Sequence, residues 1–431
     1  MSNVIHLHRP PRRLAHYLRV GHREHVLADR MRAEGRITQL GLVFDACYVG
    51  AQRDLIRDLR GEGRELILDT KAAEQSVPGR FSGTVSDVPW AHKNRPLELE
   101  DFRAGTNRSV IEPITRFAVS NGFHTVLSPS HYLGGDQIFW LDVDRESCIS
   151  LRASLDREGG QAIGINYSLL LDNAQIKDAE LVKRIVAALQ GLPIGSLWLR
   201  VSGFGMDATG AGVGKMIRAV LEFHQLGIPI IMDRLGGLAA YGLASFGATS
   251  GYANGLKGKD GFQTSGWLGP QRGGGGGNEH AIYISGLDRR VKVSEIKEIF
   301  SASSTARTTY GCRDPCCCCN IEAMLTEPEA HHLGEQARTV ADLSSVPEAR
   351  RTDHFLDVYL DGARLKADRS RRLRKAPDEF LATADKAAVR LKRMKDALEQ
   401  TSKRLGQIQF APEAQLLAGA VRSTSNIGGR T

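Results

Sequence analysis

The chain has 431 residues, with 57 Lys and Arg against 49 Asp and Glu, a formal net charge of +8 and a pI near 9.1. This length predicts one large domain with one or two smaller ones. No apolar run is long enough to span a bilayer and no secretory leader opens the sequence, so we exclude a membrane protein and expect a cytoplasmic one. The basic surplus favours an anionic partner, with nucleic acid as the first candidate.

Residues 1–33 form a basic N-terminal segment in this reading. Their charges fit either phosphate binding or a solvated helix face, because a run of charges does not distinguish the two. The arginines are Arg9, Arg12, Arg13, Arg19, Arg23, Arg30 and Arg32.

Eight short apolar runs follow, each separated from the next by a polar loop and a helical stretch. Strands buried on both faces read as continuous apolar runs, and parallel strands need helical crossovers. The pattern therefore predicts a (β/α)₈ TIM barrel over residues 34–290, with an open doubly wound sheet as the alternative. The runs cover residues 39–46, 65–69, 124–128, 162–167, 196–201, 228–233, 248–254 and 281–285.

Polar residues at the ends of these runs are the candidate site, because the C-terminal ends of barrel strands line the active-site mouth. Asp69 and Asp233 each end a strongly apolar run, and two carboxylates in one cavity can act as general base and nucleophile. The alternative is that such aspartates cap the following helices. Further substrate-binding candidates are Asp45, Ser128, Asn166, Ser202 and Gly203.

Glycine-rich loops offer a second type of site. Gly236 and Gly237 follow the run at 228–233, where backbone amides could hold a phosphate. Residues 209–215 (TGAGVGK) look like a phosphate-binding P-loop but lack its first glycine, and Met216 stands where Ser or Thr should bind magnesium, so we do not expect ATP hydrolysis. The glycine run at 273–277 reads as a flexible loop or lid.

Four consecutive cysteines at residues 316–319 point to zinc, because thiolates from a tight turn supply tetrahedral ligands at little entropic cost. Cys317 and Cys319 would face one ion, Cys312 would be a third ligand, and a histidine would complete the set. His354, His332 and His331 are the candidates for that position. Disulfides or idle thiols are the alternative. We assign residues 291–365 to a zinc-binding subdomain.

The residues of this region resemble the zinc subdomain of tRNA-guanine transglycosylases, which follows a (β/α)₈ barrel. The resemblance is carried by residues 314–319 (DPCCCC), 331–333 (HHL) and 354–364 (HFLDVYLDGAR). It implies that Cys317 and Cys319 are the family's CxC pair and His354 its late histidine. The family's third cysteine falls at Glu322, so Cys312 would supply that thiolate.

In the barrel, the resemblance places Asp69 at the family's base-binding aspartate. The family's nucleophilic aspartate falls near residues 247–254, where this chain has no acidic residue, so Asp233 would take that role. The implied reaction is base exchange in tRNA or DNA: a carboxylate attacks the anomeric carbon, guanine leaves, and a deazaguanine-type small molecule replaces it. The alternatives are a barrel enzyme that holds a phosphate-bearing cofactor or substrate through its glycine loops, and an inactive nucleic-acid-binding component.

Residues 366–410 form a basic helical extension in this reading, and residues 411–431 a flexible tail. The segment 378–406 is amphipathic and would either grip phosphates, together with the cations at 364–375, or form a homodimer interface. Its predicted buried face comprises Phe380, Leu381, Val389, Leu391, Met394 and Leu398.

Overall fold

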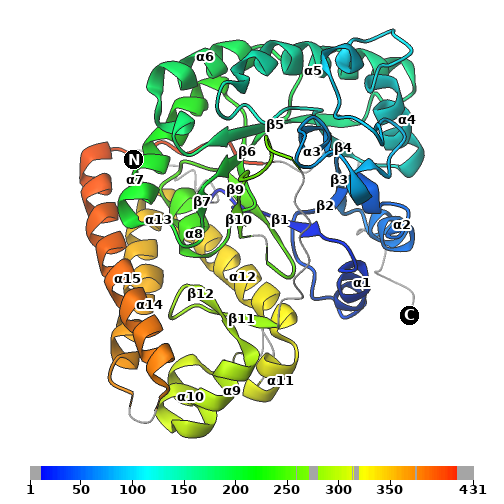
Figure 1. Ribbon diagram of the computed structural model, residues 1–431. Helices are drawn as coiled ribbons and strands as arrows, with labels where there is room; N and C mark the ends of the chain where they lie inside the picture. Colours follow the sequence, from blue (N-terminus) through cyan, green and yellow to red (C-terminus); the bar gives the residue numbers. More distant parts are fainter. Residues whose placement is uncertain are drawn as a thin grey trace, which may run out of the picture.

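The computed structural model describes residues 11–258, 260–270, 280–312, 314, 320–373 and 376–414. Eight parallel strands close into a barrel in the order β1-β2-β3-β4-β5-β6-β8-β9, with β9 returning to pair with β1 (Figure 1). The predicted (β/α)₈ TIM barrel is therefore confirmed. Its strands are β1 (Ala15–Val20), β2 (Gly41–Asp45), β3 (Glu65–Asp69), β4 (Thr125–Leu127), β5 (Gly164–Asp172), β6 (Ser196–Ser202), β8 (Ile230–Asp233) and β9 (Gly251–Gly255).

Helices between the strands cover the outside of the barrel, as parallel crossovers require. They bury one face against the sheet, and two large apolar clusters lie between helices and strands. The helices are α1 (His25–Ala33), α2 (Arg53–Gly61), α3 (Ala72–Gln75), α4 (Ile111–Asn121), α5 (Trp140–Arg157), α6 (Ala179–Leu189), α7 (Gly210–Leu221) and α8 (Gly237–Ser245).

The predicted set of barrel strands misses one strand and includes one that lies elsewhere. The barrel begins at β1, inside the segment predicted to be a basic N-terminal region, and its last strand is β9. The run at 281–285 lies outside the barrel: β11 (Ala281–Ile284) pairs antiparallel with β12 (Arg289–Lys292). The sequence AHYLRV of β1 was missed because His16 and Arg19 interrupt its apolar pattern, yet both side chains are buried.

The chain beyond the barrel folds into a helical layer at one side (Figure 1). A short antiparallel ribbon of β7 (Phe204–Gly205) and β10 (Gly261–Phe262) lies at the C-terminal end of β6. The helices beyond the barrel are α9 (Val293–Ala302), α10 (Ser304–Tyr310), α11 (Ile321–Thr326), α12 (Pro328–Ser345), α13 (Glu348–His354), the π-helical segment η7 (Phe355–Leu360), α14 (Asp361–Ser370) and α15 (Asp378–Leu405).

The long C-terminal helix confirms the predicted amphipathic segment. Helix α15 packs on α7 and α14, and the approach to α7 is so close that a β-carbon on Gly210 would lie 2.3 Å from the Met394 Cα. Val389 is an error in the predicted face, because 37% of it is exposed. The predicted residues that are fully buried are Phe380, Leu391, Met394 and Leu398.

The predicted tail at 411–431 begins as ordered chain. Ala411 donates its backbone N–H to the Gly247 carbonyl at 2.8 Å, and the Ser250 hydroxyl donates to the Pro412 carbonyl at 2.6 Å. Residues 415–431 lie outside the described ranges, as does the glycine run at 273–277.

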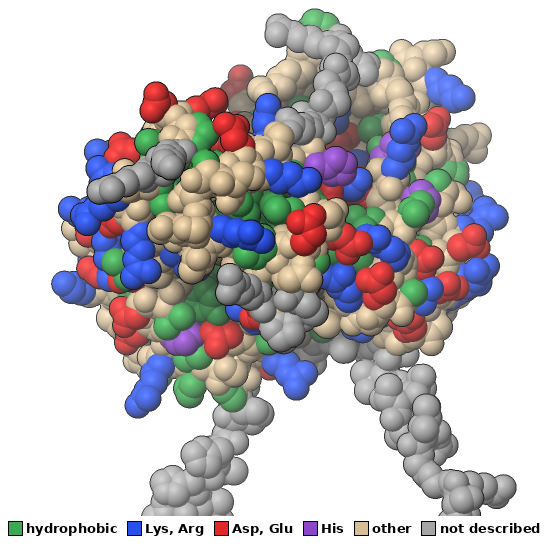
Figure 2. Space-filling model, turned by 90° about the horizontal axis from the view of Figure 1, so that it is seen from below, with side chains coloured by type: hydrophobic (Ala, Val, Ile, Leu, Met, Phe, Trp, Pro, Cys, Tyr) green, Lys and Arg blue, Asp and Glu red, His purple; other side chains and the backbone are tan. Residues whose placement is uncertain are grey.

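Charges of both signs intermingle on the face of the molecule seen in Figure 2. Several arginines of the predicted basic segment are ion-paired: Arg12 with Glu348 at 3.2 Å and Arg30 with Glu327 at 2.9 Å. Arg19 lies in the barrel interior. No helix in the described part of the chain is both long and apolar enough to cross a membrane.

Candidate functional site

Four charged side chains meet inside the barrel near the C-terminal ends of its strands. Arg19 on β1 binds Asp233 through Nε to Oδ1 at 2.6 Å and through Nη2 to Oδ2 at 2.7 Å, and its Nη1 reaches Asp69 Oδ2 at 2.9 Å. Arg200 on β6 donates from Nη2 to Asp233 Oδ2 at 2.6 Å and to Asp69 Oδ2 at 3.0 Å. The predicted pair of aspartates is thus brought together, with two guanidinium groups between them.

The surrounding cations hold both aspartates in their charged form. Burial alone would raise the pKa of Asp233, but Arg19 and Arg200 outweigh it and lower that pKa to about 2. Burial acts in the same direction on Asp69, where Lys71, Arg200 and Arg19 hold the pKa well below its ordinary value. These are permanent anions at neutral pH.

A second group of charges lies just beyond β3. Lys71 adopts a left-handed backbone with φ of 60° and extends its ammonium to Glu74 Oε1 and, at 3.7 Å, to Asp45 Oδ2. Arg234, also left-handed at φ 59°, approaches Glu74 Oε1 at 3.8 Å. Backbone conformations of this kind are costly for non-glycine residues and concentrate at functional sites.

Two atoms of this group have no hydrogen-bond partner among the described residues. They are Glu74 Oε2 and Arg234 Nε, and both are buried. Buried polar groups are almost always satisfied, so each such exception needs an explanation. An acceptor and a donor left open beside one cavity are the arrangement that a polar ligand would complete.

The cavity has a volume of about 580 Å³ and lies at the mouth of the barrel. Phe262 and Trp267 form an aromatic wall in edge-to-face contact, with ring centroids 5.3 Å apart, and Arg234 lies 5.9 Å from the centre of the Phe262 ring. Arg80 lines the cavity without an ion pair to any described residue. The polar lining also includes Asp45, Cys47, Tyr48, Lys71, Glu74, Gln263 and Ser265.

The Cys47 thiol is a poor nucleophile in this setting. Burial raises its pKa to about 12, and Asp45 adds to the effect, so the thiol stays protonated at neutral pH. The candidate nucleophiles at the mouth are therefore the carboxylates and not the Cys47 thiol.

Most of the predicted substrate-binding residues lie away from this cavity. Ser128 binds the Ser130 hydroxyl at 2.6 Å, and Ser202 binds that of Thr264 at 2.8 Å. Gly203 takes a left-handed turn at φ 76°. Asn166 was predicted at a strand end, but β5 runs on to Asp172, so Asn166 lies near the start of that strand. Asp45 alone of this set lines the mouth.

The glycine loop after β8 is filled by the protein's own carboxylate. Asp288 Oδ1 accepts the backbone N–H of Leu238 at 2.9 Å, in the first turn of α8. A β-carbon on Gly237 would lie 2.5 Å from the same Asp288 oxygen, and one on Gly236 would lie 2.6 Å from Asp260 Oδ1. The position that a phosphate would take on this loop is therefore occupied by Asp288.

The cysteine region is partly described. Cys312 and His331 line one cavity of about 230 Å³, whereas His354 Nε2 lies 2.7 Å from Asp342 Oδ2 in a neighbouring cavity. Cys317 and Cys319 lie outside the described residues. Within the described ranges, no three His, Cys, Asp or Glu side chains cluster as metal ligands. The predicted zinc site stays a prediction.

The residues missed by the sequence reasoning are Arg200, Lys71, Glu74, Arg80, Arg234, Phe262 and Trp267. One signal was present: both AHYLRV and SLWLRV contain an arginine inside an apolar strand. A charge in such a position requires a buried counter-ion, which points to the aspartates.

Comparisons with known proteins add little. No protein-family model matches the chain, and no curated protein matches it. Among solved structures, a GH10 xylanase from Bispora sp. MEY-1 with xylobiose aligns with a TM-score of 0.33 and 10% identity, over 56% of this chain and 82% of that chain. A likeness of this size carries no inference about function, and the barrel assignment rests on the strand pairing.

Proposed function

We propose that this protein is a barrel enzyme that exchanges a base in a nucleic acid, with the reacting nucleotide in the mouth cavity and Glu74 as the nucleophilic carboxylate. The observation that carries the proposal is the state of Glu74. Its Oε1 is held by Lys71 and Arg234, while its buried Oε2 accepts no hydrogen bond from a described residue. A carboxylate fixed at one oxygen and open at the other is oriented for attack.

Base exchange needs a carboxylate of this kind. Glu74 Oε2 would form a bond to the anomeric carbon as the bond to the leaving base breaks, and the base would depart with the electron pair. An incoming heterocyclic base, of deazaguanine type in the implied reaction, would then displace the carboxylate and restore it, and the N–H proton that this base loses balances the proton that the departed base takes up. The two steps together conserve the sugar and exchange only the base.

The other walls of the cavity suit a nucleotide. Aromatic rings such as Phe262 and Trp267 stack with bases whatever their sequence. Arg80, which has no ion pair in the described part of the chain, would bind a phosphate at the rim. A nucleotide drawn out of its stack would thus contact rings, a cation and the carboxylate together.

Asp69 and Asp233 take a positioning role in this proposal. Both carboxylates are bound by Arg19 and Arg200, and neither lines the mouth cavity. Their catalytic assignment from the sequence stays a prediction. The network would instead fix Lys71, whose backbone N–H donates to Asp69 Oδ1 at 3.0 Å.

A zinc ion would serve as a structural element outside the barrel. Of the described residues, Cys312 and His331 face a common cavity, so they are the better pair of ligands, with thiolates from residues 316–319 completing the set. When bound, the ion would tie together the short helices of this subdomain.

The test combines binding and base exchange. Labelled RNA and DNA oligonucleotides are titrated at several salt concentrations, and incorporation of labelled guanine is measured for the wild type, Glu74→Gln and the exposed control Glu158→Gln. We expect salt-dependent binding by all three, and incorporation that is lost only in Glu74→Gln, by about 100-fold or more.

Two results would overturn the proposal. Absence of binding to either nucleic acid at low salt would exclude the substrate class and favour a small phosphate-bearing ligand. Equal incorporation by Glu74→Gln and the wild type would exclude the nucleophile.

A further inference from the structure

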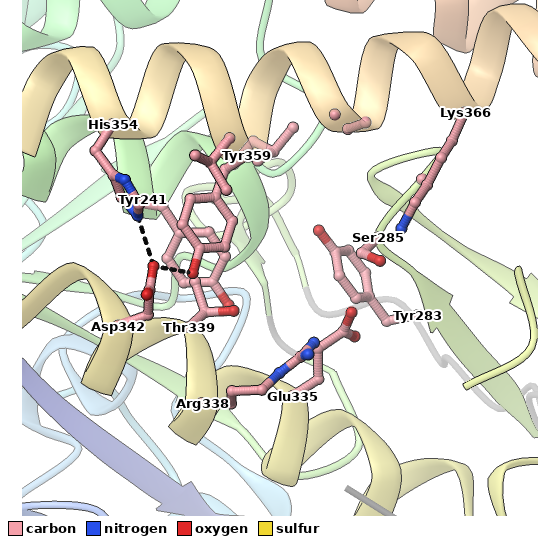
Figure 3. A pocket seen from close by; sticks show the side chains of 15 residues that line it. Tyr241, Tyr283, Ser285, Glu335, Arg338, Thr339, Asp342, His354, Tyr359 and Lys366 are labelled. Carbon is pink, nitrogen blue, oxygen red and sulfur yellow. Dashed lines mark hydrogen bonds and ion pairs between the residues drawn. The ribbon is translucent and has the colours of Figure 1, made fainter. Parts of the chain in front are cut away.

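A second cavity, of about 360 Å³, lies outside the barrel (Figure 3). It is enclosed by α8, the turn after β11, α12 and the segment from α13 to α14. Its volume falls within the range of small-molecule sites, about 300–1,000 Å³. It adjoins the cavity that contains Cys312, and the two share Tyr283, Ser285, Gly286, Glu335, Arg338 and Lys366.

Opposite charges stand at the shared end. Glu335 Oε2 is buried and has no hydrogen-bond partner among the described residues, and His331 Nε2 lies 3.9 Å from it. Lys366 on α14 forms no ion pair within the described ranges, and Figure 3 shows its ammonium directed toward Ser285 and the cavity. An open carboxylate and an open ammonium therefore face one space.

The opposite end of the cavity is lined mainly by carbon atoms. The rings of Tyr241 and Tyr359 lie along it, and Leu238 and Val358 complete its lining. Asp342 accepts a hydrogen bond from the Tyr359 hydroxyl at 2.7 Å, and His354 Nε2 contacts the same oxygen at 2.7 Å. Asp342, His354 and the Tyr359 hydroxyl are therefore already bound to one another, and the surface that a ligand would contact here is mainly carbon.

The backbone also marks this cavity. Val358 and Tyr359 belong to η7, a π-helical segment between α13 and α14. Such segments are rare and occur frequently at functional sites. Four residues of α12 line the cavity at helical spacing, from Glu335 to Asp342, so one helix supplies both the open carboxylate and the Asp342 carboxylate that binds the Tyr359 hydroxyl.

We propose that this cavity binds a free α-amino acid with a large apolar side chain. The ammonium of the ligand would pair with Glu335 Oε2. Its carboxylate would pair with the Lys366 ammonium and accept from the Ser285 hydroxyl, and its side chain would lie against Tyr241 and Tyr359. A zwitterion would pair with both the Glu335 carboxylate and the Lys366 ammonium, whereas an anion alone would leave the buried Glu335 oxygen without a hydrogen bond.

The test is equilibrium binding by calorimetry on the full chain, independent of any nucleic acid. Phenylalanine is compared with 3-phenylpropionate, which lacks the ammonium, and with phenethylamine, which lacks the carboxylate. We expect phenylalanine to bind at least about tenfold more tightly than either, since each analogue lacks one of the two charge-assisted hydrogen bonds. Glu335→Gln and Lys366→Met should each weaken phenylalanine binding by at least about tenfold, while the exposed control Lys392→Met should not.

Zinc content, measured on the same samples, separates two roles for Glu335. If Glu335→Gln loses metal and keeps phenylalanine affinity, the role of Glu335 is to position His331 as a zinc ligand, and the proposal is wrong. Absence of binding by the wild type at millimolar phenylalanine, or equal affinity for all three compounds, would also overturn it. A failure of base exchange would leave this result unaffected.

Discussion

Arg19 and Asp233 meet inside the barrel through two parallel hydrogen bonds, at 2.6 and 2.7 Å. Their strands, β1 and β8, lie on either side of β9, so the pair spans the seam at which the barrel closes. Both side chains are almost fully buried. Closure of the sheet therefore depends on Asp233 being ionised, because the charged form binds Arg19 across the seam.

Replacing Asp233 by Asn should destabilise the fold strongly. The substitution leaves Arg19 and Arg200 with less buried counter-charge, and breaking such a pair costs about 3–5 kcal/mol. The free energy of unfolding is measured by urea titration. The control is Asp54→Asn, at a side chain that is 83% exposed, for which we expect a change within about 0.5 kcal/mol. A similar small change for Asp233→Asn would show that the network does not stabilise the barrel.

Glu65 should make stability fall as pH rises toward neutrality. Burial raises its pKa to about 7 despite a hydrogen bond from the Thr125 hydroxyl, whereas the unfolded chain has an ordinary value near 4.5. Its protonated form is thus favoured by folding, and this contribution, about 3 kcal/mol, is complete below pH 4.5 and lost as pH passes 7. Glu65→Gln should remove that dependence and exceed the wild type in stability at pH 8. Parallel stability profiles for the two proteins between pH 5 and 8 would contradict this.

Gly251→Ala should disrupt the closing strand pair. A β-carbon at Gly251 would lie 2.0 Å from the Ala15 carbonyl oxygen, so β1 and β9 would have to separate. We expect a loss of at least about 2 kcal/mol, with a lower melting temperature. Gly61→Ala is the matched control, because no atom lies within 4 Å of its β-carbon and the residue ends α2. That change should be neutral or stabilise by up to about 1 kcal/mol.

Zinc analysis distinguishes His331 from His354 as a ligand. We expect about one zinc per chain in the wild type, by the tetrahedral site argument. Cys312→Ser and His331→Ala should lose it, while His354→Ala should retain it, because His354 contacts Asp342 in a different cavity. Metal that survives in His331→Ala and is lost in His354→Ala would restore the ligand set expected from the sequence.

The fold was more predictable than the site. Seven of the barrel strands appear in the sequence as apolar runs because both of their faces are buried. Helix α15 was predictable because its apolar residues recur at helical spacing. Strand β1 was not predictable in this way, because the charge of Arg19 is neutralised by aspartates on other strands, which the local sequence does not reveal. Glu74, Arg80 and Arg234 belong to connecting segments, where no periodicity signals which side chains turn inward. Their meeting depends on barrel closure, which no local pattern encodes.

The pairing of β1 with β9 also dictates an order of assembly during synthesis. Ala15 finds its partner only when Gly251 has been made, so the edge of β1 that faces β9 stays unpaired while the rest of the barrel emerges from the ribosome. The aspartates that Arg19 contacts, Asp45, Asp69 and Asp233, all precede Gly251 in the chain. The counter-ions of this buried arginine are therefore synthesised before the strand that closes the barrel.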